Sequence, residues 1–213
     1  MSVDVYKCHS QLIWIKMRNQ SNSKGEKSKR RILKEAFKLF IVYNVESVTV
    51  PLLEDTIGLK RGAIFYHFTN KEEIFIKAID FYLFSNETIF SLKYYKINTY
   101  TLQDYITNKD QQVMMISNWL KKENIEKSVF QIITHLLSQA EIYYPDFSQK
   151  ISTCYQSEKE MLTELLISAQ NKNEVRKSIL PLQIAPIFIY GMYSLPDNYS
   201  IQPAHVLYEI IKE

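Results

Sequence analysis

Glycine is scarce in this sequence: the 213-residue chain has 4 glycines, where average usage would give about 15. Nucleotide-binding folds of the Rossmann and P-loop kinds need glycine where the backbone approaches phosphate. Neither G-x-G-x-x-G nor G-x-x-x-x-G-K occurs. Few glycines, 6 prolines and long periodic stretches predict an all-α protein.

Cysteine and long apolar runs are also rare. The two cysteines, Cys8 and Cys154, exclude a disulfide framework and a zinc site of the four-ligand kind. No apolar run reaches 18 residues, so we expect no membrane-spanning helix and no membrane partner. The first twenty residues mix polar and charged side chains into their apolar stretch, unlike a secretory signal. These features predict a soluble cytoplasmic protein without a cofactor.

The sequence shows no arrangement typical of an enzyme. Its four histidines are His9, His67, His135 and His205, and none lies in an H-E-x-x-H or H-x-x-E-H motif. Cys154 has no neighbouring cysteine or histidine, and no G-x-S-x-G motif is present. Because metal and nucleophile sites need such groupings, we expect neither catalysis nor a metal site.

Positive charge is concentrated toward the amino terminus. Residues 1–84 carry 14 Lys and Arg against 9 Asp and Glu, a net charge of +5, whereas residues 85–213 carry 12 against 14, a net charge of −2. This imbalance is typical of a nucleic-acid module attached to a partner-binding body. A solvated face or a flexible tail would have the same charge. The densest cluster contains Lys24, Lys27, Lys29, Arg30, Arg31 and Lys34.

The pattern divides the chain into three parts. Residues 1–26 include a polar stretch without helical periodicity, Asn19–Gly25, and are interpreted as a flexible basic arm. Met17 precedes this stretch and offers a second possible translation start. Residues 27–85 and residues 86–213 are expected to form two helical domains.

In the first of these domains, the capping residues predict where the helices begin and end. Apolar residues at helical spacing run from Ser28 to about Asn44. Thr49 is a suitable N-cap for a second helix, and Pro51 is tolerated in its first turn. Gly58 is expected to end that helix.

A third helix over residues 61–67 and a fourth that begins at Lys71 complete a helix-turn-helix pattern. On the third helix, one arc is expected to dock on the first helix; it holds Ile64, Phe65 and Phe68. The opposite arc faces outward and holds Gly62, Ala63 and Tyr66. Small side chains there would let the helix backbone enter a major groove closely.

The segments RRILKEAFKLF and VTVPLLEDTIGLKRGAIFYHFTNKEEI resemble the DNA-binding domain of the TetR/AcrR family of bacterial repressors. The resemblance covers about residues 27–85. The positions that match the family pattern are Arg31, Ile32, Leu33, Ala36, Phe37, Leu39, Phe40, Thr49, Leu53, Gly58, Leu59, Gly62, His67, Phe68, Lys71 and Ile74.

The resemblance implies that the third helix lies in the major groove of double-stranded operator DNA. Lys60, Arg61, Ala63 and Tyr66 would then face bases or the sugar-phosphate backbone. Four residues would hold phosphates: Thr49, Tyr66, His67 and Lys71. The positive end of the fourth helix would help Lys71 to do so. Gly62 would allow close approach.

The sequence departs from the family pattern at four positions. Asn44 and Glu54 stand where glycine and alanine are usual, and Lys60 stands where serine or threonine is usual. Phe65 replaces a tyrosine whose hydroxyl reaches a phosphate in the family, so that contact is not expected here. Lys60 and the hydroxyl of Tyr66 are candidates to compensate.

Residues 86–213 are interpreted as helices over 102–122, 129–140, 146–171, 182–195 and 202–212. The fourth of these is unusually apolar, which suits either a core helix or an intersubunit face. The family resemblance implies that the last two helices form a four-helix bundle in a homodimer. The predicted interface residues are Ile184, Phe188, Met192, Val206, Leu207 and Ile210.

Aromatic residues are frequent, with 15 Tyr and 11 Phe. Aromatic side chains with a few polar tips line many small-molecule pockets, although such stripes also fill ordinary cores. The residues predicted to line an effector pocket are Tyr105, Trp119, His135, Tyr155 and Tyr190.

Together these patterns predict a DNA-binding transcriptional regulator. In the favoured interpretation it is a homodimeric repressor, released from a palindromic operator by a small hydrophobic or aromatic effector. The alternative is an effector-independent DNA-binding protein whose second domain only dimerises.

Overall fold

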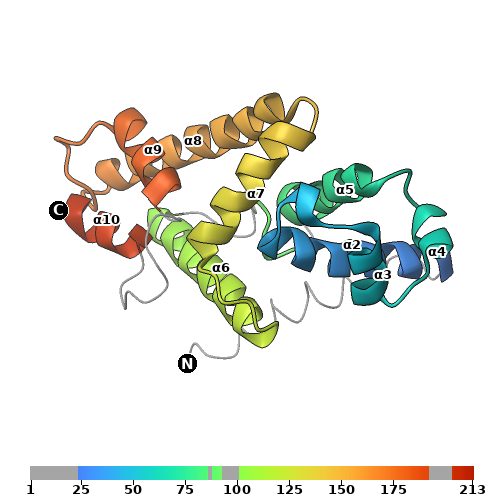
Figure 1. The fold of residues 1–213 in the computed structure, drawn as a ribbon. Helices are drawn as coiled ribbons and strands as arrows, with labels where there is room; N and C mark the ends of the chain where they lie inside the picture. Colours follow the sequence, from blue (N-terminus) through green and yellow to red (C-terminus); the bar gives the residue numbers. More distant parts are fainter. Residues whose placement is uncertain (1–23, 86–87, 93–100, 192–202) are drawn as a thin grey trace. The chain divides into compact units, whose positions relative to one another are not determined.

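The computed structural model describes residues 24–85, 88–92, 101–191 and 203–213 (Figure 1). They form two compact units, one of residues up to Ser91 together with Ile142–Tyr144, the other of Leu92–Glu141 and Pro145–Glu213. The expected all-α fold is confirmed, since the described residues are helical apart from turns and one isolated antiparallel bridge, Val175 to Lys212. Most of the predicted arm lies outside the described residues.

In the described part of the first unit, four α-helices and one short 3₁₀ helix pack together. Helix α2 packs against α5 and α3, and α3 packs against α4. Aromatic rings pack among the buried aliphatic side chains between them: the rings of Phe37 and Tyr82 stack at 3.7 Å, and those of Phe40 and Phe75 meet edge to face at 5.1 Å. The elements are α2 (Lys24–Val42), η1 (Val45–Ser47), α3 (Val50–Ile57), α4 (Arg61–Phe65) and α5 (Lys71–Phe84).

The capping residues act largely as the sequence predicts. The hydroxyl oxygen of Thr49 accepts a hydrogen bond from the Leu52 amide at 3.3 Å, and α3 ends at Gly58 with φ of 67°. Helix α4 is shorter than predicted and ends at Phe65. It ends there because the His67 amide bonds to the Ile64 carbonyl, only three residues back, which tightens the last turn.

Two tyrosines from Ile142–Tyr144 belong to the first unit. The Tyr143 hydroxyl donates to Glu46 at 2.8 Å, and the Tyr144 hydroxyl donates to Asp80 at 2.5 Å. The bond to Glu46 raises the pKa of Tyr143, since the carboxylate favours the protonated phenol. This segment therefore binds both η1 and α5.

Among the residues that the structure describes, the second unit has five helices; α8 and α9 lie side by side, and α10 packs on α6 and α9. Helix α6 has the predicted bounds, and α7 continues three residues further than predicted. Asp146 does not cap α8 with its side chain; its φ of 58° is left-handed rather than the extended conformation of an ordinary N-cap. The elements are α6 (Leu102–Lys122), α7 (Val129–Tyr143), α8 (Phe147–Asn171), α9 (Pro181–Gly191) and α10 (Pro203–Ile211). None of the described helices is long and apolar enough to span a membrane.

A polar cluster lies inside the apolar core of the second unit. The Lys109 ammonium is 2.5 Å from a Glu158 carboxylate oxygen, and both side chains are more than nine-tenths buried. The Tyr105 hydroxyl donates to the same carboxylate at 3.0 Å. This cluster joins α6 to α8, because separating either charge from its partner would leave an ion uncompensated in the core. At the next residue of α6, burial raises the pKa of Asp110 to about 6, and His205 opposes that shift.

Candidate nucleic-acid interface

Helix α4 presents a small exposed face, as predicted. Arg61, Gly62 and Ala63 are exposed, and Tyr66 at the end of the helix is 83% exposed. A Cβ atom built on Gly62 meets nothing within 4 Å. The fold itself therefore gives no steric reason for glycine at this position, which suits a surface that something else approaches closely.

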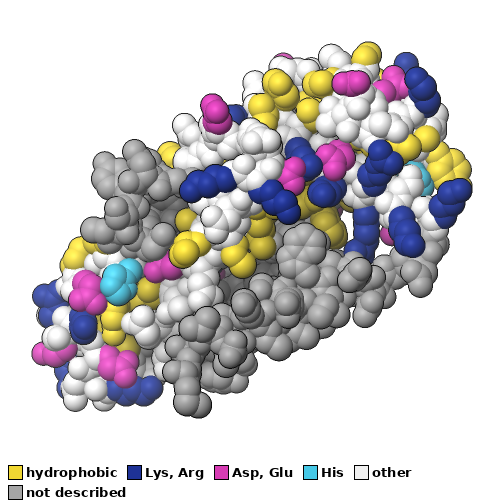
Figure 2. All heavy atoms as spheres, turned by 90° about the horizontal axis from the view of Figure 1, so that it is seen from below, with side chains coloured by type: hydrophobic (Ala, Val, Ile, Leu, Met, Phe, Trp, Pro, Cys, Tyr) yellow, Lys and Arg dark blue, Asp and Glu magenta, His cyan; other side chains and the backbone are white. Residues whose placement is uncertain are grey.

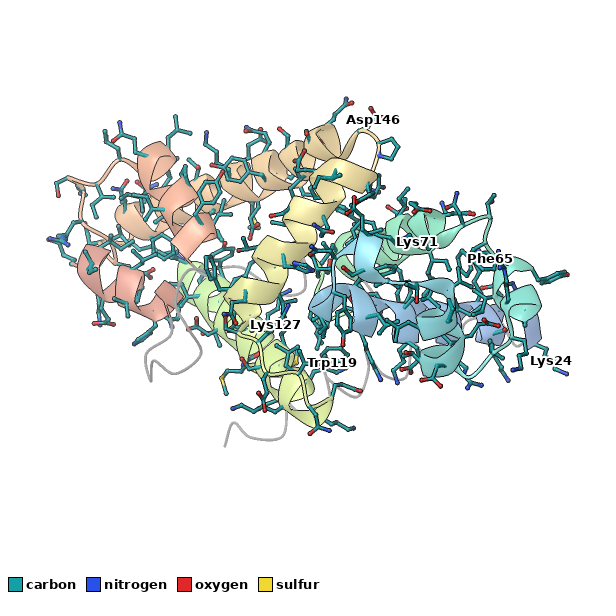
Figure 3. All side chains as sticks on the ribbon, in the orientation of Figure 1. Lys24, Phe65, Lys71, Trp119, Lys127 and Asp146 are labelled. Carbon is teal, nitrogen blue, oxygen red and sulfur yellow. The ribbon has the colours of Figure 1, made fainter. Side chains whose placement is uncertain are left out.

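The inward face of α4 is anchored by two side chains. Ile64 and Phe68 are buried, as expected. Phe65, labelled in Figure 3, is only half-buried, so its predicted docking on α2 is incomplete. Its ring instead lies 5.7 Å from the guanidinium of Arg61, a cation–π distance.

A contact from α2 fixes the turn between α3 and α4. The Arg31 guanidinium donates to the Ile57 carbonyl at 2.7 Å. Gly58 follows in the left-handed conformation, and a Cβ atom there would lie 3.0 Å from the same guanidinium. Gly58 is thus required by the fold itself, in contrast to Gly62.

Lys71 makes contacts that the sequence did not predict. Its ammonium donates to the carbonyls of Val45 at 2.8 Å and Glu46 at 3.1 Å, and thereby joins the start of α5 to η1 (Figure 3). Sequence reasoning missed this contact because its partners lie about 25 residues away along the chain. The predicted phosphate contact of Lys71 stays a prediction.

The amino end of α5 is capped by its own side chains. The Asn70 side chain accepts from the Glu73 amide at 2.7 Å, and Glu73 accepts from the Thr69 amide at 2.6 Å. The hydrogen bonds from Thr69 lower the pKa of Glu73. The helix end expected to help Lys71 hold a phosphate is therefore already occupied by an acidic side chain.

Basic side chains of the first unit lie mainly on α2. Lys24, Lys27 and Lys34 are exposed, and Figure 2 shows Lys and Arg side chains gathered on one face of this unit. Lys29 lies 5.9 Å from the ring of Phe68, which belongs to the segment after α4. The basic cluster predicted from the sequence is thus a helical surface rather than part of an arm.

The predicted effector residues do not form a single group. Tyr105 is fully buried and bonded to Glu158. Tyr155 packs against the hydrophobic core cluster that contains Tyr105. The ring of Tyr155 is 5.3 Å from that of Tyr190, which is 68% exposed. Trp119 and His135 are half-buried on α6 and α7, outside that cluster.

The predicted dimer interface needs one correction. Phe188 is fully buried within the core of its own subunit, beside Ala185 and Ile189, so it is not available to a second chain. Met192 lies outside the described residues. Of the remaining predicted positions, Ile210 is 57% exposed and three are half-buried: Ile184, Val206 and Leu207.

Other apolar residues of α9 occupy its surface instead. Leu182, Ile187 and Tyr190 are exposed, as is Ile167 on the adjacent α8. Helix α9 is apolar around most of its circumference, and such a helix gives no periodic signal that distinguishes its inner from its outer face.

Comparison with known proteins finds a family model that matches part of the first unit. Residues 32–78 match the family model described as bacterial regulatory proteins, tetR family, and this range contains α3, the turn and α4. The chain carries a TetR-family amino-terminal domain. The resemblance seen in the sequence is thereby confirmed.

The curated relatives match about a quarter of this chain. The transcriptional repressor AcnR of Corynebacterium diphtheriae is 41% identical over 56 residues, which are 26% of this chain and 30% of the repressor. The chain thus matches less than a third of the length of that relative.

Solved structures extend the likeness to the second unit. A TetR-family regulator from Agrobacterium tumefaciens has a TM-score of 0.62 at 16% identity, over 89% of this chain and all of that one. NalD of Pseudomonas aeruginosa, the secondary repressor of the MexAB-OprM multidrug efflux pump, has a TM-score of 0.57 at 19% identity, over 88% and 96% of the two chains. At such identities the likeness shows the shared helical fold.

Proposed function

We propose that the protein is a dimeric transcriptional repressor that binds operator DNA through α4. The observation that carries this proposal is the exposed face of α4 within a TetR-family domain. This face presents a cation, two small residues and a tyrosine, while buried side chains on the opposite face anchor the helix. Relatives of the domain are named transcriptional repressors, which supports a regulator rather than an enzyme. We propose that the protein acts in the cytoplasm, because a repressor acts where its operator DNA is.

In the proposed complex, α4 lies in the major groove. Arg61 and Lys60 reach base edges or flanking phosphates from its amino end, and Tyr66 contacts DNA from its other end. Thr49 and His67 hold phosphates on either side. The small side chains of Ala63 and Gly62 let the helix backbone approach the DNA closely.

The structure suggests a modified role for Lys71. Because its ammonium donates to two carbonyls of η1, we assign it chiefly to the support of the segment that precedes Thr49. The basic surface of α2 supplies the long-range attraction to phosphates.

A single α4 helix reads too few base pairs to select one operator, so two subunits must act together. We propose that the subunits associate through α8 and α9. The exposed apolar residues of these helices support this assignment, since a lone subunit would leave them in water. Two-fold symmetry of the pair would make the operator palindromic.

Release by an effector is the finer part of the proposal. Tyr155 and Tyr190 offer aromatic surface to a small hydrophobic or aromatic molecule in the second unit, and its binding would lower operator affinity by linkage. One observation favours the effector-independent alternative: Tyr105 is fully buried and hydrogen-bonded, as in a solid core. A screen for compounds that release bound DNA separates the two.

The experiment that tests DNA binding is selection of bound duplexes from random sequence by the full-length protein. We expect a palindromic sequence to be enriched. Affinity for that duplex should fall steeply with salt, with a log–log slope of several units for two subunits, because phosphate contacts release counterions. A flat salt response together with no enriched sequence would contradict the proposal.

Replacement of Gly62 by alanine should separate folding from DNA binding. Alanine favours a helix over glycine, so the free energy of unfolding should rise by about 0.5–1 kcal/mol. Affinity for the selected duplex should fall, because the added methyl group meets no protein atom but lies on the face proposed to approach DNA. Thermal unfolding and a binding titration measure the two effects.

The matched control for this change is Gly58→Ala. It should destabilise the first unit, because Gly58 has a positive φ and faces Arg31. If Gly62→Ala leaves the affinity unchanged, α4 does not approach DNA as proposed.

A further inference from the structure

Glu54 holds both ends of the turn that joins α3 to α4. Its backbone carbonyl accepts hydrogen bonds from the amides of Gly58 at 2.9 Å and Leu59 at 3.3 Å, which close α3. Its side-chain oxygen Oε1 accepts from the Arg61 amide at 2.5 Å, at the first residue of α4. One residue therefore sets where α3 stops and where α4 begins.

The side-chain bond from Glu54 supplies what the N-cap residue of α4 lacks. That N-cap is Lys60, and its side chain makes no capping hydrogen bond. A lysine ammonium only donates, so it cannot accept from the free amides at a helix start. Glu54, seven residues before Arg61, provides the acceptor from the preceding helix.

Arg61 is consequently held at two points. Glu54 fixes its backbone amide, and the ring of Phe65, one turn further along α4, lies 5.7 Å from its guanidinium. The side chain nevertheless stays exposed. A side chain held in this way loses less conformational freedom when it meets a base edge.

We infer that Glu54 is a positioning residue that sets the sequence specificity of α4, an inference that rests on the proposed function. It holds Arg61 where the side chain reaches a base. Its carboxylate also repels the DNA backbone at the amino end of α4. Both effects favour the selected sequence over any other, since non-specific binding depends on phosphate attraction alone.

The test compares full-length Glu54→Ala and Glu54→Gln with Asp55→Asn. Asp55 is an exposed acid on the same helix, so its substitution removes the same charge without the capping bond. Affinity is measured for the duplex that the wild type selects and for a scrambled duplex of equal length, at several salt concentrations. Thermal unfolding and circular dichroism monitor the fold.

For Glu54→Ala we expect affinity for the selected duplex to fall about tenfold or more, the effect of a lost cap in two subunits. Affinity for the scrambled duplex should rise. Glu54→Gln keeps an acceptor oxygen, so it should restore most of the affinity for the selected duplex while binding to the scrambled duplex stays raised. Asp55→Asn should leave the ratio of the two affinities within about twofold of the wild-type ratio, because the bond from the Arg61 amide to Glu54 is kept.

The inference is overturned if Glu54→Ala has the same affinity ratio as Asp55→Asn. Should Glu54→Ala fail to fold, Glu54→Gln decides: wild-type affinity for the scrambled duplex would likewise overturn the inference. If the wild type enriches no duplex at all, the proposed function fails and the inference fails with it. This result can be distinguished from failure of the inference alone, which depends on differences among the variants.

Discussion

Replacement of Arg61 by alanine is expected to weaken operator binding by about 1–3 kcal/mol per half-site and to relax the base preference at one position of each half-site. Arg61 is exposed at the first residue of α4, its amide bonded to Glu54 and its guanidinium against Phe65. Such a side chain suits bidentate recognition of guanine. Selection from random DNA with the variant, followed by titration of the duplexes, measures both effects.

The control for the Arg61 variant is Lys77→Ala. Lys77 is an exposed cation on α5, so its loss changes the net charge by the same amount away from α4. We expect it to reduce affinity only slightly. A uniform loss for Arg61→Ala across all sequences would assign Arg61 to a phosphate, and an unchanged affinity would remove it from the interface.

Replacement by glutamate should have different effects at two neighbouring residues of α9. Phe188→Glu would place a carboxylate in the core, and the loss of packing alone costs about 3–5 kcal/mol, so the second unit should unfold. Ile187 is 49% exposed, so Ile187→Glu should leave the subunit folded. It should nevertheless disrupt the dimer, because the charge would be buried unpaired between subunits, and operator affinity should fall by orders of magnitude.

Sedimentation and circular dichroism distinguish these outcomes. Met114→Glu is the matched control, since Met114 is a similarly exposed apolar residue on α6 and should tolerate the charge as a dimer. Either of two results would contradict the proposed interface: a wild type that sediments as a monomer at micromolar concentration, or an Ile187→Glu variant that still dimerises and binds DNA.

The parts of the fold that depend on local chemistry were predicted well from the sequence. Thr49 and Gly58 delimit α3 as expected, because a cap bonds to residues only a few positions away. The outward face of α4 was also predicted, since Gly62 and Tyr66 fall opposite the buried Ile64 on a helical wheel.

Contacts between residues distant in sequence were not predicted. Lys71 binds carbonyls of η1, and Glu54 caps α4 from another helix. Lys71 has the charge that DNA-contacting positions favour, and Glu54 has the charge that such positions avoid. The type of residue alone could therefore not separate a structural role from a role in DNA binding. Phe188 was assigned to the wrong face because α9 is apolar nearly all round, and only packing decides which side meets the core.

The most direct test of major-groove binding by α4 is methylation interference on the duplex that the wild type selects. Methylation of guanine N7 blocks contacts in the major groove. We predict interference at two symmetric clusters of guanines, about one helical turn of DNA apart or slightly more, and loss of one position in each cluster with Arg61→Ala. A single cluster, or binding that major-groove methylation leaves unchanged, would contradict the proposal.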